Sequence, residues 1–352
     1  MVSKRALGID IGTSSIKIIE LSRLGGGERI KLENYGEASL FTLYEKPFRT
    51  SEKGLLSLSS QEISRAIKAI LEEARISATQ AVISIPDFST FFTNFELPPL
   101  TKKELPEAVK FEARHQIPLP LTEVTLDWSL IEGEAGERPE EKLQILLIAV
   151  PNEVVNQYRE IAELSQLQLL SLEAEVFSLV RSLIKKEKDK RIQALVDIGA
   201  QSTTVSIIDQ GVLKRTYSFD VSGNGLTQVL AKALSIDYKE AESFKKKYGL
   251  VSPEKAIAEV LYPLIDLILR EIEKISQDFY QSEGKKIDQV ILAGGSALLP
   301  GLRDYFFSRL KKEVIIANPF SDIFYPPILD KTLKEMGPAY AISVGTALRG
   351  LE

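Results

Sequence analysis

The sequence of 352 residues predicts an α/β protein with two lobes, because one strand–turn–strand pattern occurs twice. The first copy is Ala6–Glu20 (ALGIDIGTSSIKIIE), and the second runs from Ala194 to Ile208 (ALVDIGAQSTTVSII). In both copies an apolar run reaches Asp-x-Gly, passes hydroxyl-rich residues and continues into alternating apolar residues, which is typical of paired strands. A third stretch, Asp288–Ser296, has the composition of a buried strand that ends in two glycines. We therefore expect a duplicated fold.

The composition is ordinary for a globular protein, with 44% hydrophobic residues, 26% charged residues and a formal net charge of −5. This charge offers no basic surface for nucleic acid, and the absence of cysteine excludes disulfides, thiolate metal sites and cysteine nucleophiles. Apolar runs such as Ile145–Val150 are far shorter than the ~20 residues of a membrane helix, and Asp10 interrupts any signal-like core. We expect a cytoplasmic protein that meets a membrane only through a partner.

The first part of the chain predicts strands followed by one amphipathic helix. After the turn at Gly25–Gly27 we expect a strand over Arg29–Leu40 and a loop over residues 44–60. An apolar stripe predicts a helix over Gln61–Arg75 with Ser60 as its N-cap. A strand over Ala81–Ile85 ends at Pro86.

The next part predicts a compact inserted α+β subdomain. Its expected elements are a strand at Phe91–Leu97, a helix at Lys102–Gln116, strands at Thr125–Ile131 and Leu143–Val150, and a helix at Val154–Leu164. His115, the single histidine, has no cysteine or second histidine with which to form a metal cluster, and a charge near a helix C-terminus explains it better.

The remaining chain alternates helices with the second hairpin. We expect a helix over Ser171–Lys186, and the charge run Lys185–Arg191 is best explained as a solvated helix end. Further helices are expected after Gly223, within Tyr238–Leu250, over Val260–Phe279 and after Leu299-Pro300-Gly301.

The tip of the first hairpin carries the chemistry of a phosphate site. Gly12 lets the backbone approach an anion, Thr13 and Ser14 donate from their hydroxyls, and Asp10 can hold a hydrated divalent cation. Taken alone, the same residues also fit an ordinary tight hairpin turn.

Three further segments are candidates for the walls of a cleft. Gly223-Asn224-Gly225 opens a helix, whose backbone donors can face an anion. Glu242 and Lys245 share one helical face, where the alternative is a plain surface ion pair. The run Gly294-Gly295-Ser296 ends a strand and leaves room for a flat base or a ribose.

These motifs carry a family resemblance. The runs DIGT, DIGAQST and ILAGGSALLPGL occur in the order of the actin-like nucleotide-binding fold, which actin, heat-shock chaperones, sugar kinases and FtsA share. The resemblance implies that the two hairpins hold phosphates from opposite lobes, while the Gly-Gly turn holds adenosine.

A narrower resemblance covers nearly the whole chain. The runs SIKIIELS, ELPPLTKKELPEAVKFEARHQIPLPL, DYKEAESFKKKYGL, ANPFSDI and GPAYAISVGTALRGL are similar to the PilM family, cytoplasmic actin-like proteins of the type IV pilus inner-membrane assembly complex. It implies a duplicated actin-like ATPase fold with an inserted small α+β subdomain, as in FtsA. The implied parts are a first lobe at 1–85, the inserted subdomain at 86–165, a crossing helix and connection at 166–190, a second lobe at 191–325 with a helical subdomain at about 225–285, and a C-terminal helix at 326–352 that returns to the first lobe.

The resemblance also implies a binding site for ATP or ADP with Mg²⁺. Asp10 and Asp197 would hold the metal, mainly through water, because Mg²⁺ keeps much of its hydration shell. The implied nucleotide-binding residues are Asp10, Gly12, Thr13, Ser14, Asp197, Gly199, Gln201, Ser202, Thr203, Gly223, Glu242, Lys245, Gly294, Gly295 and Ser296. Lys17, on the strand that leaves the first hairpin, and Lys246 are weaker candidates.

Hydrolysis would need a polar side chain that orients water. Glu175 lies at about the position where heat-shock chaperones have their water-orienting side chain, although its neighbours differ from the chaperone pattern. The alternative is that Glu175 is an ordinary solvated charge on a helix. We expect weak ATPase activity or none.

We therefore expect an ATP-binding scaffold of a type IV pilus, or of a related type II secretion complex. It would bind the short cytoplasmic N-terminal segment of a PilN-type inner-membrane protein in a nucleotide-linked manner, at the cytoplasmic side of that membrane. Contacts with pilus motor or platform proteins and self-association are further implied partners. The alternatives are an FtsA-like filament former that tethers polymers to membrane, and a true ATPase or kinase. Because the chain stops at Leu348–Glu352 directly after a core-like helix, we expect no amphipathic anchor, which disfavours the FtsA-like alternative.

Overall fold

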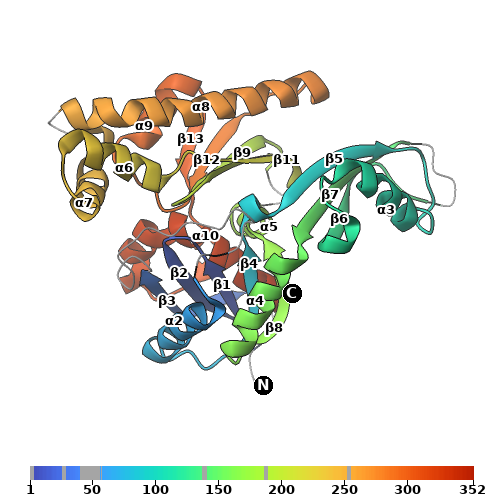
Figure 1. Cartoon of the computed structure of the whole chain (residues 1–352), viewed down its shortest axis with the longest axis horizontal. Coiled ribbons are helices and arrows are strands. Elements are labelled where there is room, and N and C mark those ends of the chain that lie inside the picture. Colours follow the sequence, from blue (N-terminus) through green and yellow to red (C-terminus); the bar gives the residue numbers. More distant parts are fainter. Residues whose placement is uncertain are drawn as a thin grey trace.

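The computed structural model describes residues 4–25, 29–39, 56, 58–136, 141–185, 189–251 and 255–352. The loop expected over residues 44–60 lies mostly outside these residues. The described chain forms two lobes, each with its own sheet, and a third small sheet stands to one side of them (Figure 1).

The first lobe contains a six-stranded sheet in the order β14-β3-β2-β1-β4-β8. Strands β1 (Arg5–Ile11), β2 (Ser15–Arg23) and β3 (Ile30–Ser39) are antiparallel neighbours. Strands β4 (Gln80–Ile85) and β8 (Gln168–Ala174) continue the sheet in parallel with β1, and the short β14 (Ile323–Phe324) pairs with β3. Polar residues such as Glu20 are buried inside it only with partners, here Arg5 and Asn34.

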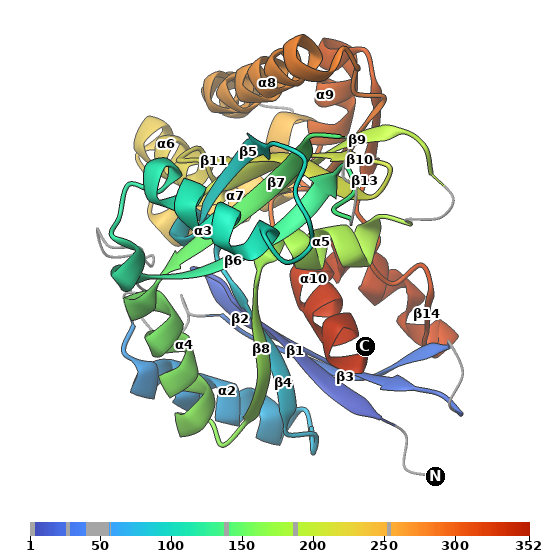
Figure 2. The ribbon, with the colours of Figure 1, turned by 90° about the vertical axis from the view of Figure 1, so that its right-hand side faces the viewer.

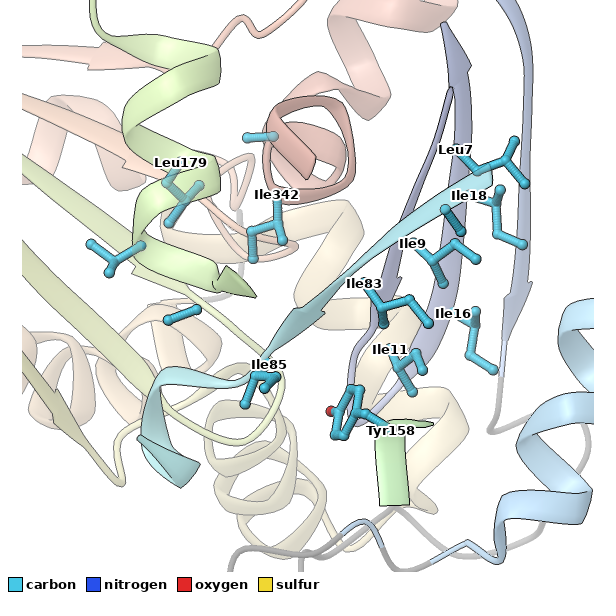
Figure 3. Close-up of a cluster of buried hydrophobic side chains, with 14 of the residues drawn as sticks. Leu7, Ile9, Ile11, Ile16, Ile18, Ile83, Ile85, Tyr158, Leu179 and Ile342 are labelled. Atoms are coloured by element: carbon cyan, nitrogen blue, oxygen red, sulfur yellow. The ribbon is translucent and has the colours of Figure 1, made fainter. Parts of the chain in front are cut away.

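Helices cover both faces of this sheet. Alternation along β1 sends Leu7, Ile9 and Ile11 to the face covered by α2 (Ser60–Glu73) and α4 (Asn152–Leu164), and Figure 3 shows Tyr158 beside Ile11. The other face is covered by α10 (Asp330–Leu351), which packs closely on β1. One sheet thus has two apolar faces, which explains the nearly unbroken apolar run of β1.

The second lobe contains a five-stranded sheet in the order β11-β10-β9-β12-β13. Its strands are β9 (Ile192–Ile198), β10 (Thr203–Asp209), β11 (Val212–Phe219), β12 (Gln289–Ala293) and β13 (Glu313–Ile316). Its helices are α6 (Gly223–Leu234), α7 (Tyr238–Tyr248), α8 (Lys255–Glu283) and α9 (Leu302–Leu310). Together they enclose a separate apolar core.

The two hairpins are equivalent in their geometry. Gly12 N donates to Ser15 O at 3.1 Å, and Gly199 N donates to Ser202 O at 3.0 Å, so both turns close with the same bond. The antiparallel pairs β1–β2 and β9–β10 have matching registers around these turns. The repeated sequence pattern therefore reflects repeated structure.

The inserted sheet has the order β5-β7-β6, with β5 (Phe91–Leu97), β6 (Val124–Glu132) and β7 (Leu143–Pro151) antiparallel. Helix α3 (Leu105–Gln116) packs on one face, and Figure 2 shows this sheet beside the second lobe. The middle strand β7 serves two cores. Ile145, Leu147 and Ala149 belong to the core of the inserted sheet, whereas Leu146, Ile148 and Val150 join the large cluster that contains the first-lobe core and also second-lobe residues such as Leu195 and Leu213.

The helix expected over Ser171–Lys186 is wrong in its first four residues. Residues up to Ala174 form β8, because Ser171 to Ala174 pair in parallel with β4, and the helix α5 is only Glu175–Leu183. The N-cap expected at Ser60 is also displaced by one residue. Ser59 is the cap, because its side chain accepts from Glu62 N while Glu62 caps Ser59 N in return.

Candidate functional site

A cavity of about 720 Å³ lies between the two lobes. It is lined by residues from both hairpins, from the start of α6, from α7 and from the turn after β12. The expected site residues that line it are Asp10, Gly12, Thr13, Ser14, Lys17, Glu175, Asp197, Gly199, Gln201, Ser202, Gly223, Glu242, Lys245, Lys246, Gly294, Gly295 and Ser296. The fold therefore brings residues that are up to 286 positions apart (10 to 296) to one place.

Thr203 is the expected residue that does not line the cavity. It is the first residue of β10 and is fully buried, and its Oγ1 donates to Val221 O at 2.6 Å. Because strand side chains alternate, its side chain points to the opposite face from that of Thr204, which does line the cavity. Its role here is to hold the segment that precedes α6.

The first hairpin presents one buried carboxylate and several hydroxyls to the cavity. Asp10, 4% exposed, accepts from Ser84 Oγ at 3.3 Å, whereas Ser14 is exposed. Lys17 Nζ donates to Ser15 Oγ at 2.7 Å and lies 3.9 Å from Glu37 Oε1. The lysine thus lies at the cavity wall with its charge only loosely paired.

The second hairpin places Asp197 opposite the first. Asp197 is 9% exposed, and its Oδ1 is buried with no hydrogen-bond partner among the described residues. A buried, unpartnered carboxylate oxygen is costly unless something binds it. The oxygen therefore fits a cation or a cation-bound water supplied from the cavity.

Four carboxyl groups gather at this point and repel one another. Burial raises the pKa of Asp197 to about 7, and Asp10 adds to the rise. Burial likewise raises the pKa of Asp10 against the attraction of Lys17, and raises the pKa of Glu175 well above its usual range, with Asp87 and Asp10 contributing. A cation between these groups would relieve the repulsion. Within the described residues no three His, Cys, Asp or Glu side chains are arranged to hold a metal ion by themselves.

The wall from the second lobe is a buried polar cluster on α7 and α6. Lys245, with a side chain 6% exposed, lies 2.7 Å from Glu242 Oε2 and donates to Gly223 O at 2.9 Å and to Thr227 Oγ1 at 2.8 Å. Burial lowers the pKa of Lys245, and this effect outweighs the neighbouring Glu242 carboxylate, which raises it. Burial favours a higher pKa for Glu242, but the bonds with Lys245 and Thr227 outweigh it and the pKa is lowered. The pair is therefore a built part of the cavity and not a solvated surface pair.

The glycine turn after β12 lets the backbone approach the second hairpin. Gly294 has φ +86°, and a Cβ there would lie 2.5 Å from Asp197 Oδ1. Gly295, in contrast, faces open space. A flat group can therefore lie against this turn without meeting a side chain.

Several lining residues were missed from the sequence, among them Glu37, Phe88, Tyr238 and Glu335. Asp87 was also missed, although it is 3% exposed and lies beside the cavity. It follows Pro86 at the end of β4, so an acidic residue just beyond a buried strand was the available signal. Glu175 is partly buried, so the alternative of a solvated charge is wrong.

Two duplicated lobes, each with an Asp-x-Gly hairpin at a shared cleft, define the actin-like ATPase fold. Solved structures agree. The chain matches the structure of a PilM–PilN type IV pilus biogenesis complex with a TM-score of 0.86 and 24% identity, over 99% of this chain and 98% of that chain. It matches MreB5 of Spiroplasma citri bound to ADP with a TM-score of 0.53 and 16% identity, over 98% and 95% of the two chains.

The chain belongs to the family of the type IV pilus assembly protein PilM, whose family model matches residues 8–351. Its role therefore lies in type IV pilus assembly. It is also 22% identical to the cell division protein FtsA of Streptococcus pneumoniae over 352 aligned residues, which span 89% of this chain and 77% of FtsA. No helix in the described part of the chain is both long and apolar enough to span a membrane.

Proposed function

We propose that the protein is a nucleotide-binding scaffold in which ATP or ADP, with Mg²⁺, occupies the cleft between the lobes. The bound nucleotide holds the lobes closed. The closed form then binds the short cytoplasmic N-terminal segment of a PilN-type membrane protein between the first lobe and the inserted subdomain. This places the protein at the cytoplasmic side of the inner membrane through its partner.

The observation that carries the nucleotide site is the buried, unpartnered Asp197 Oδ1 opposite the hairpin of Asp10. The backbone amides and hydroxyls of the two hairpins supply donors for phosphate oxygens, and Asp10 with Asp197 would hold Mg²⁺ largely through water. Glu242 and Lys245 would contact the ribose and base beside the Gly294 turn. Two similar structures of MreB5 of Spiroplasma citri, bound to ADP and to AMPPNP, support this assignment.

The structural similarity to a PilM–PilN complex supports the partner. Nucleotide alters partner affinity only if it binds the two lobe arrangements differently. The lining of the cleft comes from both lobes, so a nucleotide bound there would make different contacts if the separation of the lobes changed, which supports the linkage.

The test is Asp197→Ala, with Asp209→Ala as the matched control. Asp209 is also buried in β10, but it pairs with Lys285 at 2.7 Å and does not line the cleft. Affinities for Mg²⁺-ATP and for a synthetic peptide of the partner's N-terminal segment are measured by calorimetry. We expect Asp197→Ala to weaken both and Asp209→Ala to weaken neither. If ATP binding is lost while peptide affinity is unchanged, the two sites are not linked.

The similarity to FtsA favours a second candidate, a filament-forming membrane tether. Sedimentation with Mg²⁺-ATP tests it, since polymers pellet and a scaffold does not. A true ATPase or kinase would instead turn over substrate at about 1 per second or faster. In that role Glu175 would orient the attacking water, and Glu175→Gln would abolish turnover.

A further inference from the structure

The inserted subdomain leaves the first lobe beside the proposed nucleotide cleft. Between β4 and β5 the chain forms η1, a single 3₁₀ turn over Asp87–Ser89. Pro86 and Phe88, on either side of Asp87, line the cleft. The connection to the subdomain is therefore itself part of the cleft wall.

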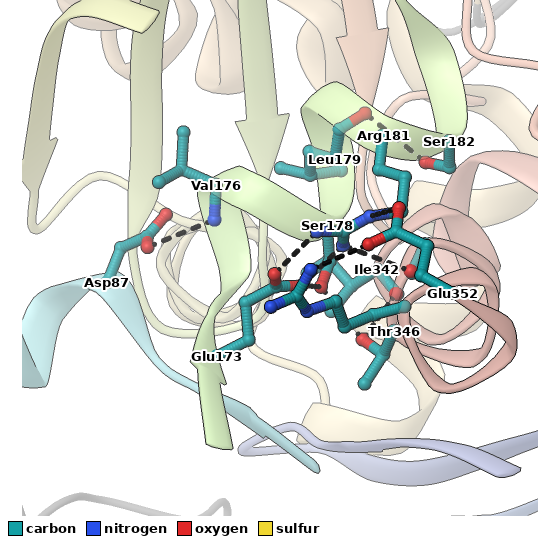
Figure 4. Close-up of polar contacts among 12 residues, drawn as sticks. Asp87, Glu173, Val176, Ser178, Leu179, Arg181, Ser182, Ile342, Thr346 and Glu352 are labelled. Carbon is teal, nitrogen blue, oxygen red and sulfur yellow. Dashed lines mark hydrogen bonds and ion pairs between the residues drawn. The ribbon is translucent and has the colours of Figure 1, made fainter. Parts of the chain in front are cut away.

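This connection is held to α5 by two reciprocal hydrogen bonds. Asp87 Oδ1 accepts from Val176 N at 3.2 Å, and Asp87 N donates to Glu175 Oε2 at 3.2 Å. Figure 4 shows the Asp87 side chain directed at the first turn of α5. Each carboxylate thus satisfies a backbone donor at the start of the other's helix. Phe92 of β5 adds an apolar contact with Phe177 of α5, with ring centroids 6.5 Å apart.

Glu175 connects this pair to the contents of the cleft. Its carboxyl lines the cavity together with Asp10 and Asp197, so charge placed between those two acts on it directly. The raised pKa values of Glu175 and Asp87 report the same proximity, since burial and neighbouring carboxylates cause both. Because Glu175 Oε2 accepts from Asp87 N, a displacement of the Glu175 side chain by a ligand would be transmitted to Asp87.

The far end of the connection is fixed to the second lobe. Asn94 of β5 donates its side-chain amide to Lys214 O of β11, and Lys214 Nζ lies 2.8 Å from Glu132 Oε2 of β6. The Lys214 side chain is 9% exposed. The inserted subdomain is therefore attached to both lobes, and a change in their separation would act on its two connections to the first lobe, η1 and the junction of β7 with α4.

We propose that the Asp87–Glu175 pair transmits the state of the nucleotide cleft to the inserted subdomain and so to the surface that binds the partner peptide. This inference rests on the proposed function, because it concerns how its two sites communicate. Asp87 acts in it as a positioning residue. It touches the connection and α5, while Glu175 faces the ligand.

The experiment measures peptide affinity with and without Mg²⁺-ATP, and takes the ratio of the two dissociation constants as the coupling factor. The probe is a synthetic peptide of the N-terminal cytoplasmic segment of the PilN-type protein. We expect a coupling factor of about fivefold or more for the unmodified protein, falling to about one in Asp87→Ala. Asp87→Asn keeps an oxygen that can accept from Val176 N, so we expect it to restore most of the coupling.

Ser178→Ala is the matched control. Ser178 is a fully buried residue of α5 whose Oγ bonds to Glu173 and to Thr346, so it stabilises the same helix without touching the connection. We expect its coupling factor to stay at the unmodified value.

The outcomes separate the inference from the function on which it rests. An unmodified protein whose peptide affinity ignores nucleotide overturns the proposed function. A linkage that survives in Asp87→Ala overturns the inference alone.

Amide hydrogen exchange provides a second measurement that needs no variant, should Asp87→Ala fold poorly. Protection of the Asp87 and Val176 amides should change when Mg²⁺-ATP is added, and unchanged protection in a protein with linked affinities contradicts the inference.

Discussion

The buried Lys245 and the partly exposed Glu242 form an ion pair one turn apart on α7, with Nζ 2.7 Å from Oε2, and the same ammonium donates to Gly223 O at the start of α6. The lysine therefore ties two helices of the second lobe together at the wall of the cleft. A residue in this position affects both the stability of the lobe and the contents of the site.

Replacing Lys245 with Met should weaken both properties. It removes the ammonium from Glu242 Oε2 and one of the two donors to Gly223 O, the other being Thr227 Oγ1, and we expect the free energy of unfolding to fall by about 1–3 kcal/mol. Nucleotide affinity should fall by about tenfold, measured by calorimetry with Mg²⁺-ATP. Lys247→Met is the control, because Lys247 lies over the Tyr248 ring at 4.9 Å and does not line the cleft. Equal effects of the two variants would contradict this assignment.

The neighbouring glycines of the turn after β12 should respond differently to alanine. Gly294 has φ +86° and a Cβ there meets Asp197, so Gly294→Ala should destabilise the protein by about 1–2 kcal/mol from the backbone conformation alone. Gly295→Ala adds a methyl group to open space and should leave the melting temperature of the unliganded protein nearly unchanged. Thermal unfolding of both variants measures this difference in stability, and a loss of stability in Gly295→Ala would count against the geometry of this turn.

The crossing of α5 and α10 should tolerate no added atom. A Cβ at Gly345 would overlap Ser178 O, so Gly345→Ala should cost about 1–3 kcal/mol by overpacking. Gly337 lies on the same helix with 3.3 Å to its nearest neighbour, Pro319 Cδ, so Gly337→Ala should be close to neutral. Chemical denaturation measures both, and similar midpoints would show that the two helices can move apart.

Stability should depend on pH through Asp87. Burial raises the pKa of this group to about 8 in the folded chain, whereas its ordinary value is 3.8. Between these values the unfolded chain has lost the proton and the folded chain retains it, so stability falls as pH rises through this window. Asp87→Asn cannot ionise, and its unfolding free energy should fall less between about pH 5 and about pH 8. A parallel pH dependence in both proteins would mean that Asp87 is ionised in the native state.

Ligand should stabilise the protein by mass action. At a Mg²⁺-ATP concentration about 100 times the dissociation constant, the free energy of unfolding should rise by about 2.7 kcal/mol. Removing the metal with a chelator should reverse most of it, because Asp10 and Asp197 would hold the metal beside the phosphates. A melting temperature that ignores both additions would argue that the cleft binds neither.

Local patterns were enough to predict the duplicated fold, and all but one of the site residues named from the sequence and its family resemblance line the cleft, although they make up only about half of its lining. Each hairpin is predicted by alternating apolar residues and by an Asp-x-Gly turn, and both signals depend only on residues close together in the sequence. The boundary between β8 and α5 was missed because Ser171 to Ala174 become a strand only through pairing with β4, far away in the chain. Asp87 was missed for a similar reason, since its partners Glu175 and Val176 are 88 and 89 positions away.

The strand β7 belongs to two cores at once, with Ile145 and Leu147 on one side and Leu146 and Ile148 on the other. A subdomain that is joined only by flexible linkers can rotate through large angles. The inserted sheet cannot, because side chains of its central strand β7 pack into the neighbouring core. The inserted sheet should therefore move only by small tilts that preserve the packing of β7 in both cores. Signalling of this kind alters the tightness of a groove, so a change in X-ray scattering on addition of nucleotide should come from closure of the two lobes and not from a large displacement of the inserted sheet.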